Sequence, residues 1–379
     1  MNFLIVGANF YNKGAQLMLL SVIESLKQRY PNSRICVSPT IGTQEQIDSL
    51  GVEILDYPLF HVGAGKTFER YLKFGKFLRF LRKDPKGTIK WKNVNAIFDI
   101  SGFAFSDQWG INPVKNLSIF LDAAVKNQTK YILMPQAFGP FEGEGMKKYM
   151  TEVLQKADLV FPRDRVSYQY VSSLVDDPAK IKMAPDITLT YGGGSKELGN
   201  YCCAIPNGRI LDQGAELWAT EYEKLLNETI AKICSQTDLQ VKVLIHDTGK
   251  IDSDLAQKLV ENNDSDRVTI VAEEDALKLK KAIAQSQFVI GSRFHSLASA
   301  LSSNVPSIAL GWSHKYTMLF DNYGVAEYSF LAPDPKILER LDTLLNPGDR
   351  AAIRSKLQQA NEQVKAESEK MWAAIGAKL

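Results

Sequence analysis

Residues 284–316 constrain the fold of this chain more than any other stretch. They open with the apolar run at 288–290, which is long enough for a buried parallel strand and too short for a helix. A Gly-Ser pair interrupts this run, and apolar residues then recur at helical spacing over 297–301. A second strand pattern follows at 306–310. The stretch therefore predicts a β-turn-α-β unit, the building block of a parallel sheet.

Arg293 and His295 lie where the predicted strand ends and the helix begins. Free backbone N–H groups and the positive end of the helix dipole favour an anion there, and open parallel sheets bind ligands at this edge. A guanidinium and an imidazole on such a turn predict a phosphate or carboxylate substrate and proton transfer. The structural alternative is that Arg293 caps a loop and His295 bonds to backbone. The pair His314 and Lys315, after the next strand, favours the functional interpretation.

Length and charge set wide limits on the class of protein. The 379 residues are enough for two domains, and a formal net charge of +2 gives no support to general nucleic-acid binding. The four cysteines have no zinc spacing, and no His, Asp and Cys cluster does, so we expect reduced thiols and no required metal. Met1 leads directly into a strand pattern and no apolar run reaches transmembrane length. We therefore expect no secretory signal and a cytoplasmic protein.

A glycine-rich segment at 191–195 separates two halves of similar pattern. The first half opens with a strand, a loop and an apolar helix, but it has neither a G-x-G-x-x-G nor a Walker A sequence. A nicotinamide cofactor is therefore not expected. Strand and helix patterns alternate again in the second half. We predict two Rossmann-like, doubly wound α/β domains, residues 1–194 and 195–379, facing across a cleft.

Two carboxylates follow the same predicted strand in the first half. Asp99 precedes a Ser-Gly turn at the end of the strand at 94–100. Asp107 is followed by Gln108 and Trp109, so that a carboxylate, an amide and an indole come together, a combination suited to sugar hydroxyls and a ring face. Both acids are candidate site residues.

Three further polar residues follow strand patterns and are candidates for substrate binding. Gln136 comes after the strand at 130–134, in a loop fixed by two prolines and a glycine. Asn12 precedes Gly14 at a helix start, where it either seats a polar ligand or forms a structural turn. Arg163 stands before Asp164 at another helix start, where an ion pair is the alternative to a ligand contact.

The segment 66–92 is basic and aromatic. Its apolar residues fall within one arc at helical spacing, and lysines and arginines occupy the rest of the circumference. Such a helix either lies on an anionic membrane surface or packs its aromatic stripe on the sheet. The sequence leaves both alternatives open.

Taken together, these motifs resemble the polysaccharide pyruvyl transferase family. The matching features run almost from end to end, and their order and spacing make the match specific. They are Gly7…Asn12-Lys13-Gly14-Ala15, Ser101-Gly102, Pro135-Gln136…Gly139-Pro140, Arg163-Asp164…Ser167, Pro185-Asp186, Gly291-Ser292-Arg293-Phe294-His295, Pro306 and His314-Lys315. The chain departs from the family pattern in having Lys13-Gly14 where many members have Gly-Asp, Asp99 to Gly102 where glycines are frequent, and Phe294 where leucine is usual. The first departure predicts a subfamily with its own acceptor.

The resemblance implies a fold similar to the glycosyltransferase B type, with the acceptor on the first domain and phosphoenolpyruvate on the second. It also implies transfer of a pyruvyl group from phosphoenolpyruvate to two hydroxyls of a saccharide, which gives a cyclic ketal and phosphate. The expected context is biosynthesis of a capsule or exopolysaccharide, with no cofactor beyond the donor. A lipid-linked acceptor would give segment 66–92 a purpose at the inner membrane face.

The same resemblance implies roles for the candidate residues. His295 transfers a proton, and Asp99 or Asp107 orients or deprotonates the acceptor hydroxyl. Because the donor carries a phosphate and a carboxylate, several cations are expected to bind it. The expected substrate-binding residues are Arg293, Arg209, Lys315, His314, Asn12, Gln136 and Arg163.

Two other functions compete with this one. A glycosyltransferase of the same fold would bind a sugar nucleotide, and it predicts tight binding of a nucleoside diphosphate. A non-catalytic binding module would keep the fold without the chemistry, and it predicts that His295 and Arg293 can be replaced without loss of turnover.

Overall fold

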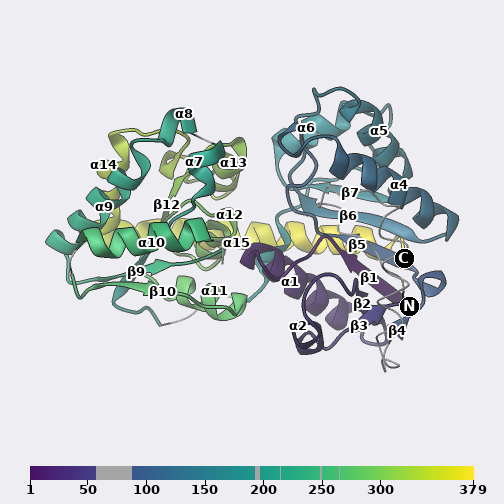
Figure 1. The fold of residues 1–379 in the computed structure, drawn as a ribbon, viewed down its shortest axis with the longest axis horizontal. Helices are drawn as coiled ribbons and strands as arrows, with labels where there is room; N and C mark the ends of the chain where they lie inside the picture. Colours follow the sequence, from purple (N-terminus) through teal and green to yellow (C-terminus); the bar gives the residue numbers. More distant parts are fainter. Residues whose placement is uncertain (57–87, 193–196, 214, 248–249, 264) are drawn as a thin grey trace. The chain divides into compact units, whose positions relative to one another are not determined.

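The computed structural model describes residues 1–379 apart from 57–87, 193–196, 214, 248–249 and 264. The chain divides into two compact units (Figure 1). The first unit is Met1–Phe10, Met18–Ile187 and Glu367–Leu379, and the second is Tyr11–Leu17 and Thr188–Ala366. Each unit contains one parallel sheet with helices, which confirms the prediction of two Rossmann-like α/β domains.

The unit boundaries are more interleaved than the predicted division at 194. The chain passes between units at Ile187–Thr188, just before the glycine-rich segment, of which 193–195 lie outside the described residues. Helices α1 (Lys13–Arg29) and α15 (Pro347–Gly376) each contribute residues to both units. A linear division of the sequence cannot represent a helix that is shared in this way. Asn12, expected in the first domain, consequently belongs to the second unit.

The first unit is built on a seven-stranded sheet in the order β4-β3-β2-β1-β5-β6-β7, with every neighbouring pair parallel. Its strands are β1 (Asn2–Val6), β2 (Arg34–Val37), β3 (Glu53–Leu55), β4 (Thr88–Ile89), β5 (Ala96–Asp99), β6 (Lys130–Gln136) and β7 (Leu159–Pro162). The strand order reverses between β1 and β5. In open sheets of this kind, ligands bind at the carboxyl ends of strands at such a reversal.

The helices of the first unit follow its strands. Besides most of α1, they are α2 (Gln44–Ser49), α4 (Asn112–Lys126), α5 (Met146–Lys156) and α6 (Arg165–Ser172). The short 3₁₀ turns η1 (Trp91–Asn93) and η2 (Asp107–Trp109) lie between its strands in the sequence, and η3 (Ile187–Thr190) lies at the boundary of the unit. Figure 1 shows α4, α5 and α6 grouped beside β6 and β7, and α4 packs against both α5 and β6. These three helices therefore cover the sheet at its β6 and β7 end.

The second unit has a six-stranded parallel sheet in the order β10-β9-β8-β11-β12-β13. Its strands are β8 (Tyr201–Ile205), β9 (Gln240–Leu244), β10 (Val268–Val271), β11 (Val289–Gly291), β12 (Ser307–Leu310) and β13 (Ser329–Phe330). Here the strand order reverses between β8 and β11, because the chain moves outward through β9 and β10 before it returns. The predicted Arg293 and His295 turn therefore follows a strand at the reversal point.

The helices of the second unit alternate with its strands along most of the chain. They are α7 (Arg209–Gln213), α8 (Ala215–Trp218), α9 (Tyr222–Gln236), α10 (Lys250–Asn263), α11 (Ala276–Ala284), α12 (Phe294–Ser302), α13 (His314–Asn322), the 3₁₀ turn η4 (Ala326–Tyr328), α14 (Lys336–Leu345) and the larger part of α15.

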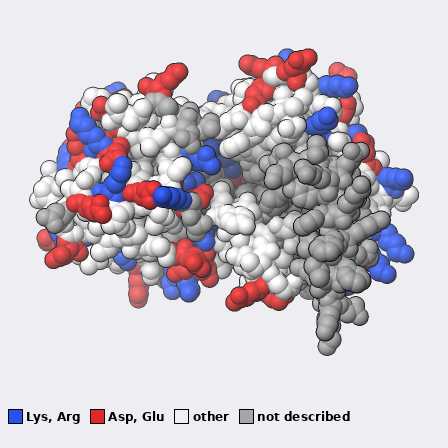
Figure 2. Space-filling model, viewed as in Figure 1, with Lys and Arg blue, Asp and Glu red and all other residues white. Residues whose placement is uncertain are grey.

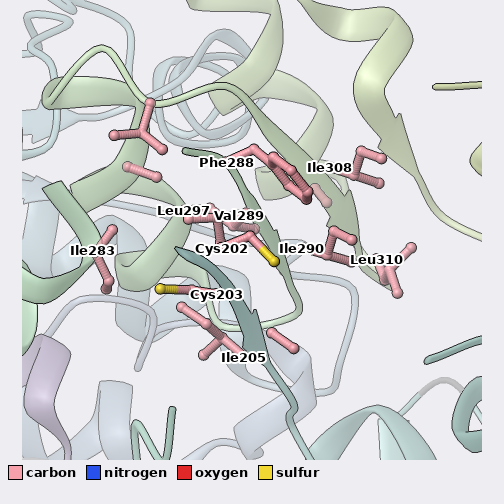
Figure 3. Close-up of a cluster of buried hydrophobic side chains, with 14 of the residues drawn as sticks. Cys202, Cys203, Ile205, Ile283, Phe288, Val289, Ile290, Leu297, Ile308 and Leu310 are labelled. Carbon is pink, nitrogen blue, oxygen red and sulfur yellow. The ribbon is translucent and has the colours of Figure 1, made fainter. Parts of the chain in front are cut away.

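The stretch 284–316 forms the predicted β-turn-α-β unit, as β11, α12 and β12. Its apolar residues are buried in the core of the second unit (Figure 3). In that view Phe288, Val289 and Ile290 lie beside Leu297 of α12 and Ile308 of β12. Cys202 and Cys203 of β8 belong to the same core as free thiols, and burial raises the pKa of Cys203 to about 12. These cysteines are therefore held as thiols at neutral pH.

Several elements are not among the predicted ones, some because they are too short to give a sequence signal. β3, β4 and β13 have two or three residues each, too few to produce a recognisable alternation. Helix α4 has an amphipathic pattern with Pro113 in its first turn, and α14 is similarly amphipathic. Both helices were readable from the sequence but were not assigned.

The surface of the described residues carries both signs of charge. On the face shown in Figure 2, lysines and arginines are interspersed with acidic residues over the second unit. The membrane-contact prediction for 66–92 falls almost entirely on 57–87, outside the described residues. Among the residues that the structure does describe, no helix is both long and apolar enough to cross a bilayer.

Burial of β11 makes a specific prediction about stability. Truncating Ile290 to Ala removes a side chain that is enclosed in the core, and it should lower the free energy of unfolding by about 2–5 kcal/mol. Leu277→Ala is the matched control, because Leu277 is exposed and its truncation should cost no more than about 0.5 kcal/mol. Urea denaturation of both variants measures the difference. Equal midpoints would contradict the assignment of β11 to the core.

Candidate active site in the second unit

The turn between β11 and α12 is held by hydrogen bonds from three directions. The Ser292 N–H donates to Ile205 O of β8 at 3.0 Å. The carbonyl of Ser292 accepts from Asn207 Nδ2 and from the Tyr316 hydroxyl, each at 2.8 Å, and the Tyr222 hydroxyl donates to Ser292 Oγ at 2.7 Å. All of these groups are buried. The backbone that presents Arg293 and His295 is thus fixed before any ligand binds.

Arg293 forms a charge cluster with two carboxylates. Its Nε and Nη2 donate to Asp252 Oδ2 at 2.9 and 2.5 Å, and its Nη1 donates to Asp247 Oδ2 at 3.3 Å. The Gly208 N–H donates to the other oxygen of Asp252 at 2.9 Å. Burial raises the pKa of Asp252, while the Arg293 charge acts in the opposite direction. All three guanidinium nitrogens are engaged, so the positive charge of Arg293 is largely balanced within the protein.

His295 lies in the first turn of α12, directly against Gly14. A Cβ placed on Gly14 would stand 2.1 Å from Nδ1 of His295, far inside contact distance. The ring of Phe294 meets the imidazole edge-on, with 5.3 Å between centroids. The glycine at the start of α1 is therefore required by the position of the histidine ring, and not by an unusual backbone angle.

The first turn of α1 is part of this site. Asn12 Oδ1 accepts from the Gly14 N–H at 2.8 Å, which caps the helix, and Asn12 forms an antiparallel bridge with Asp247. Lys13 is only 5% exposed, and its ammonium donates to Glu274 O at 2.5 Å. Asn12 thus forms the structural turn that is one of the two alternatives predicted for it, and its contact with a ligand stays a prediction. Lys13 is a buried cation that was not among the predicted binding residues.

His246 is a second histidine at the same edge that sequence reasoning passed over. It follows β9, is 5% exposed, and its Nδ1 has no hydrogen-bond partner among the described residues. Burial holds the pKa of His246 well below its ordinary value, and the nearby charges of Arg293, His295 and Lys13 lower it further. His246 is therefore neutral at physiological pH. His246 could have been predicted in the same way as His295, because each is a polar residue just after the end of a strand.

The remaining cations predicted in this half are less enclosed. Arg209 begins α7 with an exposed side chain, and its N–H donates to Asn207 Oδ1 at 3.0 Å. His314 and Lys315 open α13 and are half-buried. The Lys315 ammonium lies over the rings of Trp312 and Tyr316, at 5.2 and 5.3 Å from their centroids. Asn207, which contacts Arg209, and Tyr316, which contacts Lys315, also hold the Ser292 turn.

In the first unit, Asp99 is completely enclosed. Its Oδ1 accepts from the Ser101 N–H at 2.9 Å and from Ser101 Oγ at 2.5 Å, and its Oδ2 accepts from the Tyr131 hydroxyl at 2.6 Å. Burial raises the pKa of this carboxyl, although these bonds favour the ionised form. Gly7 approaches Ser101 so closely that a Cβ would lie 2.6 Å from its N and Oγ. The geometry thus gives Asp99 a role in shaping the turn at the β1 and β5 reversal.

Asp107, Gln136 and Arg163 differ in their access to a ligand. Asp107 is half-buried and accepts from the N–H groups of Glu142 and Gly143 at 2.5 and 2.9 Å. Gln136 is fully buried, and neither atom of its amide has a hydrogen-bond partner in the described part of the chain. Arg163 forms a buried ion pair with Asp186 at 2.8 Å, which agrees with the structural alternative for this residue.

Three solved structures are similar in fold over almost the whole chain. A UDP-GlcNAc 2-epimerase from Neisseria meningitidis bound to UDP-GlcNAc has a TM-score of 0.62 at 10% identity, with 100% of both chains covered. Anabaena Alr3699/HepE in complex with UDP and glucose has 0.59 at 12%, with 99% of both covered. S. aureus MnaA with UDP has 0.58 at 11%, covering 94% of this chain and 91% of the other. Together with the two parallel sheets, these likenesses confirm a two-domain fold similar to the glycosyltransferase B type.

The chain belongs to the polysaccharide pyruvyl transferase family. The family model matches residues 12–314, which is most of the chain and includes the capping Asn12, Lys13, the Arg293 and His295 turn, and His314. No curated protein matches the sequence. The resemblance inferred from the motifs is thus confirmed. No group of three or more His, Cys, Asp or Glu side chains in the described ranges could hold a metal ion, and the absence of a required metal stays a prediction.

The contact between Gly14 and His295 predicts the effect of a single methyl group. Gly14→Ala should displace the imidazole of His295, because the new Cβ cannot fit at 2.1 Å from Nδ1. The ring resonances of His295 in an NMR spectrum should shift, and any activity that depends on this ring should fall. Gly291→Ala is the matched control, since a Cβ there meets Ile205 at an ordinary 3.4 Å. An unshifted His295 resonance in Gly14→Ala would contradict the contact.

The depressed pKa of His246 predicts an acid-sensitive stability. Below pH 6.5 the unfolded chain takes up a proton at this residue while the folded chain does not, so the free energy of unfolding decreases as pH falls. The slope is limited to about 1.4 kcal/mol per pH unit for one proton. His246→Phe should flatten the curve of unfolding free energy against pH between pH 7 and the acid limit of folding. Titration of the His246 ring signal near pH 6.5 in the folded protein would contradict the prediction.

Proposed function

We propose that this protein transfers the pyruvyl group of phosphoenolpyruvate to two hydroxyls of a saccharide, which forms a pyruvate ketal and releases phosphate. Family membership supports the reaction class. The observation that carries the assignment to a site is the fixed turn that places His295 at the sheet reversal of the second unit, among Lys13, His246 and Arg293. The saccharide belongs to cell-surface polysaccharide biosynthesis, and we propose no cofactor beyond the donor.

The reaction needs two proton transfers, and a histidine suits both. A proton added to the methylene carbon of phosphoenolpyruvate makes it a methyl group, and the first hydroxyl then bonds to the carbon that carries phosphate. The second hydroxyl bonds to the same carbon as the C–O bond to phosphate breaks. The two hydroxyl protons balance the one taken up by carbon and the one that leaves with phosphate. His295 is the proposed proton carrier, because an imidazole near neutral pKa both gives and accepts protons.

The charges around His295 support an anionic donor. The starts of α1 and α12 meet there, since Gly14 in the first turn of one touches His295 in the first turn of the other. Neither helix has an acidic residue in its first turn to offset its positive end. Arg293, Arg209, Lys315 and His314 remain proposed substrate contacts, although the Arg293 charge is shared with Asp247 and Asp252.

For the acceptor, the two proposed acids are not equivalent. Asp107 is half-buried, whereas Asp99 is 0% exposed and committed to Ser101 and Tyr131. We therefore propose Asp107 as the better placed of the two to orient a hydroxyl. Gln136 and Arg163 stay proposals as acceptor contacts, and Gln136 has hydrogen-bonding capacity to spare. A cytoplasmic location, at the inner membrane face if the acceptor is lipid-linked, belongs to the same proposal.

A sugar nucleotide is the competing donor. The solved structures of similar fold contain UDP or UDP-GlcNAc, and the same sheet edge that suits phosphoenolpyruvate suits a diphosphate. This second function predicts nucleotide release from a sugar nucleotide in the presence of an acceptor, with no consumption of phosphoenolpyruvate.

Turnover tests the proposal directly. With phosphoenolpyruvate and a panel of saccharides that have free neighbouring hydroxyls, the wild type should release phosphate, and the product should gain the mass of one pyruvic acid minus one water. His295→Asn should lower kcat by about 10²–10⁴-fold. Asp107→Asn should lower it more than Asp99→Asn does at equal folded fraction. Full turnover in both aspartate variants, with loss only in the histidine variant, would remove the acids from the mechanism. Turnover with a sugar nucleotide alone would overturn the proposal.

A further inference from the structure

Lys13 is a buried cation without a buried anion. It is 5% exposed, and lysine is rarely buried so deeply unless it is paired. Its ammonium donates to a neutral acceptor, Glu274 O at 2.5 Å, and it forms no ion pair within the described chain. An ammonium has three donors, so at least one direction remains for a ligand. A charge held in this state is costly unless an anion joins it.

His246 provides a second, independent indication of a ligand. It is nine-tenths or more buried, and its Nδ1 has no partner among the described residues. It adjoins Asp247, which bridges to Asn12 beside Lys13 and binds Arg293 at 3.3 Å, so it lies at the loops that carry this cluster. The acids beside this cluster, Asp247 and Asp252, are both bound to Arg293. A neutral imidazole in this position can donate from one ring nitrogen to an oxyanion.

The helix starts add to the same field. The first turns of α1 and α12 are in contact through Gly14 and His295, and α12 has nine residues with no side-chain cap bond at Arg293. Helix N-termini attract phosphate because their N–H groups and dipoles point toward it. Two such ends, one unneutralised lysine and one unpartnered buried histidine nitrogen therefore converge in the second unit.

We propose that Lys13, His246 and His295 form a subsite for a phosphate monoester dianion, with Lys13 supplying the charge that Arg293 shares with its two carboxylates. The proposal rests on the proposed function in one respect, namely that phosphoenolpyruvate is the phosphate monoester which occupies the subsite. Lys13 then sets the affinity for the donor, while Arg293 with Asp252 and Asp247 maintains the geometry of the loops.

Calorimetric titration of the full chain with inorganic phosphate, phosphoenolpyruvate and uridine diphosphate tests the subsite. Lys13→Met should weaken the binding of phosphate and phosphoenolpyruvate by on the order of tenfold or more, and Lys13→Arg should restore part of it. Lys280→Met is the matched control: Lys280 is also buried and donates to a backbone carbonyl, Thr188 O at 2.7 Å, but from α11. Lys280→Met should bind phosphate and phosphoenolpyruvate with the affinity of the wild type.

The outcomes separate the subsite from the function. Equal phosphate affinity in the wild type and Lys13→Met, or no phosphate binding by the wild type, would overturn the subsite. If Lys13→Met does not fold, Lys13→Arg and His246→Asn decide, and unchanged affinity in both overturns it. Phosphate binding that depends on Lys13 without turnover of phosphoenolpyruvate would leave the subsite standing and refute the function. Turnover of phosphoenolpyruvate with the same KM in Lys13→Met as in the wild type would refute the subsite and leave the function standing. A much stronger uridine diphosphate signal that depends on Lys13 would reassign the occupant.

Discussion

The ion-pair cluster centred on Arg293 connects the loops on which the proposed site depends. Arg293 follows β11, Asp247 follows β9, and Asp252 in α10 accepts from the backbone of Gly208 after β8. Asp247 also bridges to Asn12 at the start of α1. Removing one partner from such a half-buried cluster leaves an uncompensated charge, which costs far more than the pair contributes. The cluster therefore specifies how the loops meet, and its value lies in geometry more than in net stability.

Because Arg293 is paired in this way, Arg293, Lys13 and the two histidines of this region have different roles. The Arg293 guanidinium, with its nitrogens directed at two carboxylates, acts mainly as a clamp. Lys13 is buried against a carbonyl and has no ion pair within the described chain, and His246 is held neutral by burial and by its cationic neighbours. The region thus offers a buried lysine without an ion pair, a neutral imidazole that can form hydrogen bonds, and His295, the proposed proton carrier. This combination suits the proposed reaction, in which a phosphate ester is protonated at carbon.

The sequence predicted the frame of the site better than its contacts. The strand, turn and helix at 284–316 were readable from local pattern, because burial of β11 and α12 imposes apolar runs of defined length. The edge of the sheet was likewise predictable. Which way a side chain turns at that edge was not: Asp99 is enclosed because Tyr131, one strand away, reaches it with a hydroxyl. Asp252 has no local signal, since its partner Arg293 is distant in sequence, and Gly14 owes its identity to a ring on another helix.

We propose that the second unit binds phosphoenolpyruvate at the edge occupied by His295 and Lys13. The most direct measurement is the free energy of unfolding with and without saturating phosphoenolpyruvate, and separately with uridine diphosphate. A ligand at one hundred times its dissociation constant stabilises the fold by about 2.7 kcal/mol. We expect this gain with phosphoenolpyruvate and a much smaller one with the nucleotide. Stabilisation by uridine diphosphate alone would contradict this proposal and make a sugar nucleotide the donor.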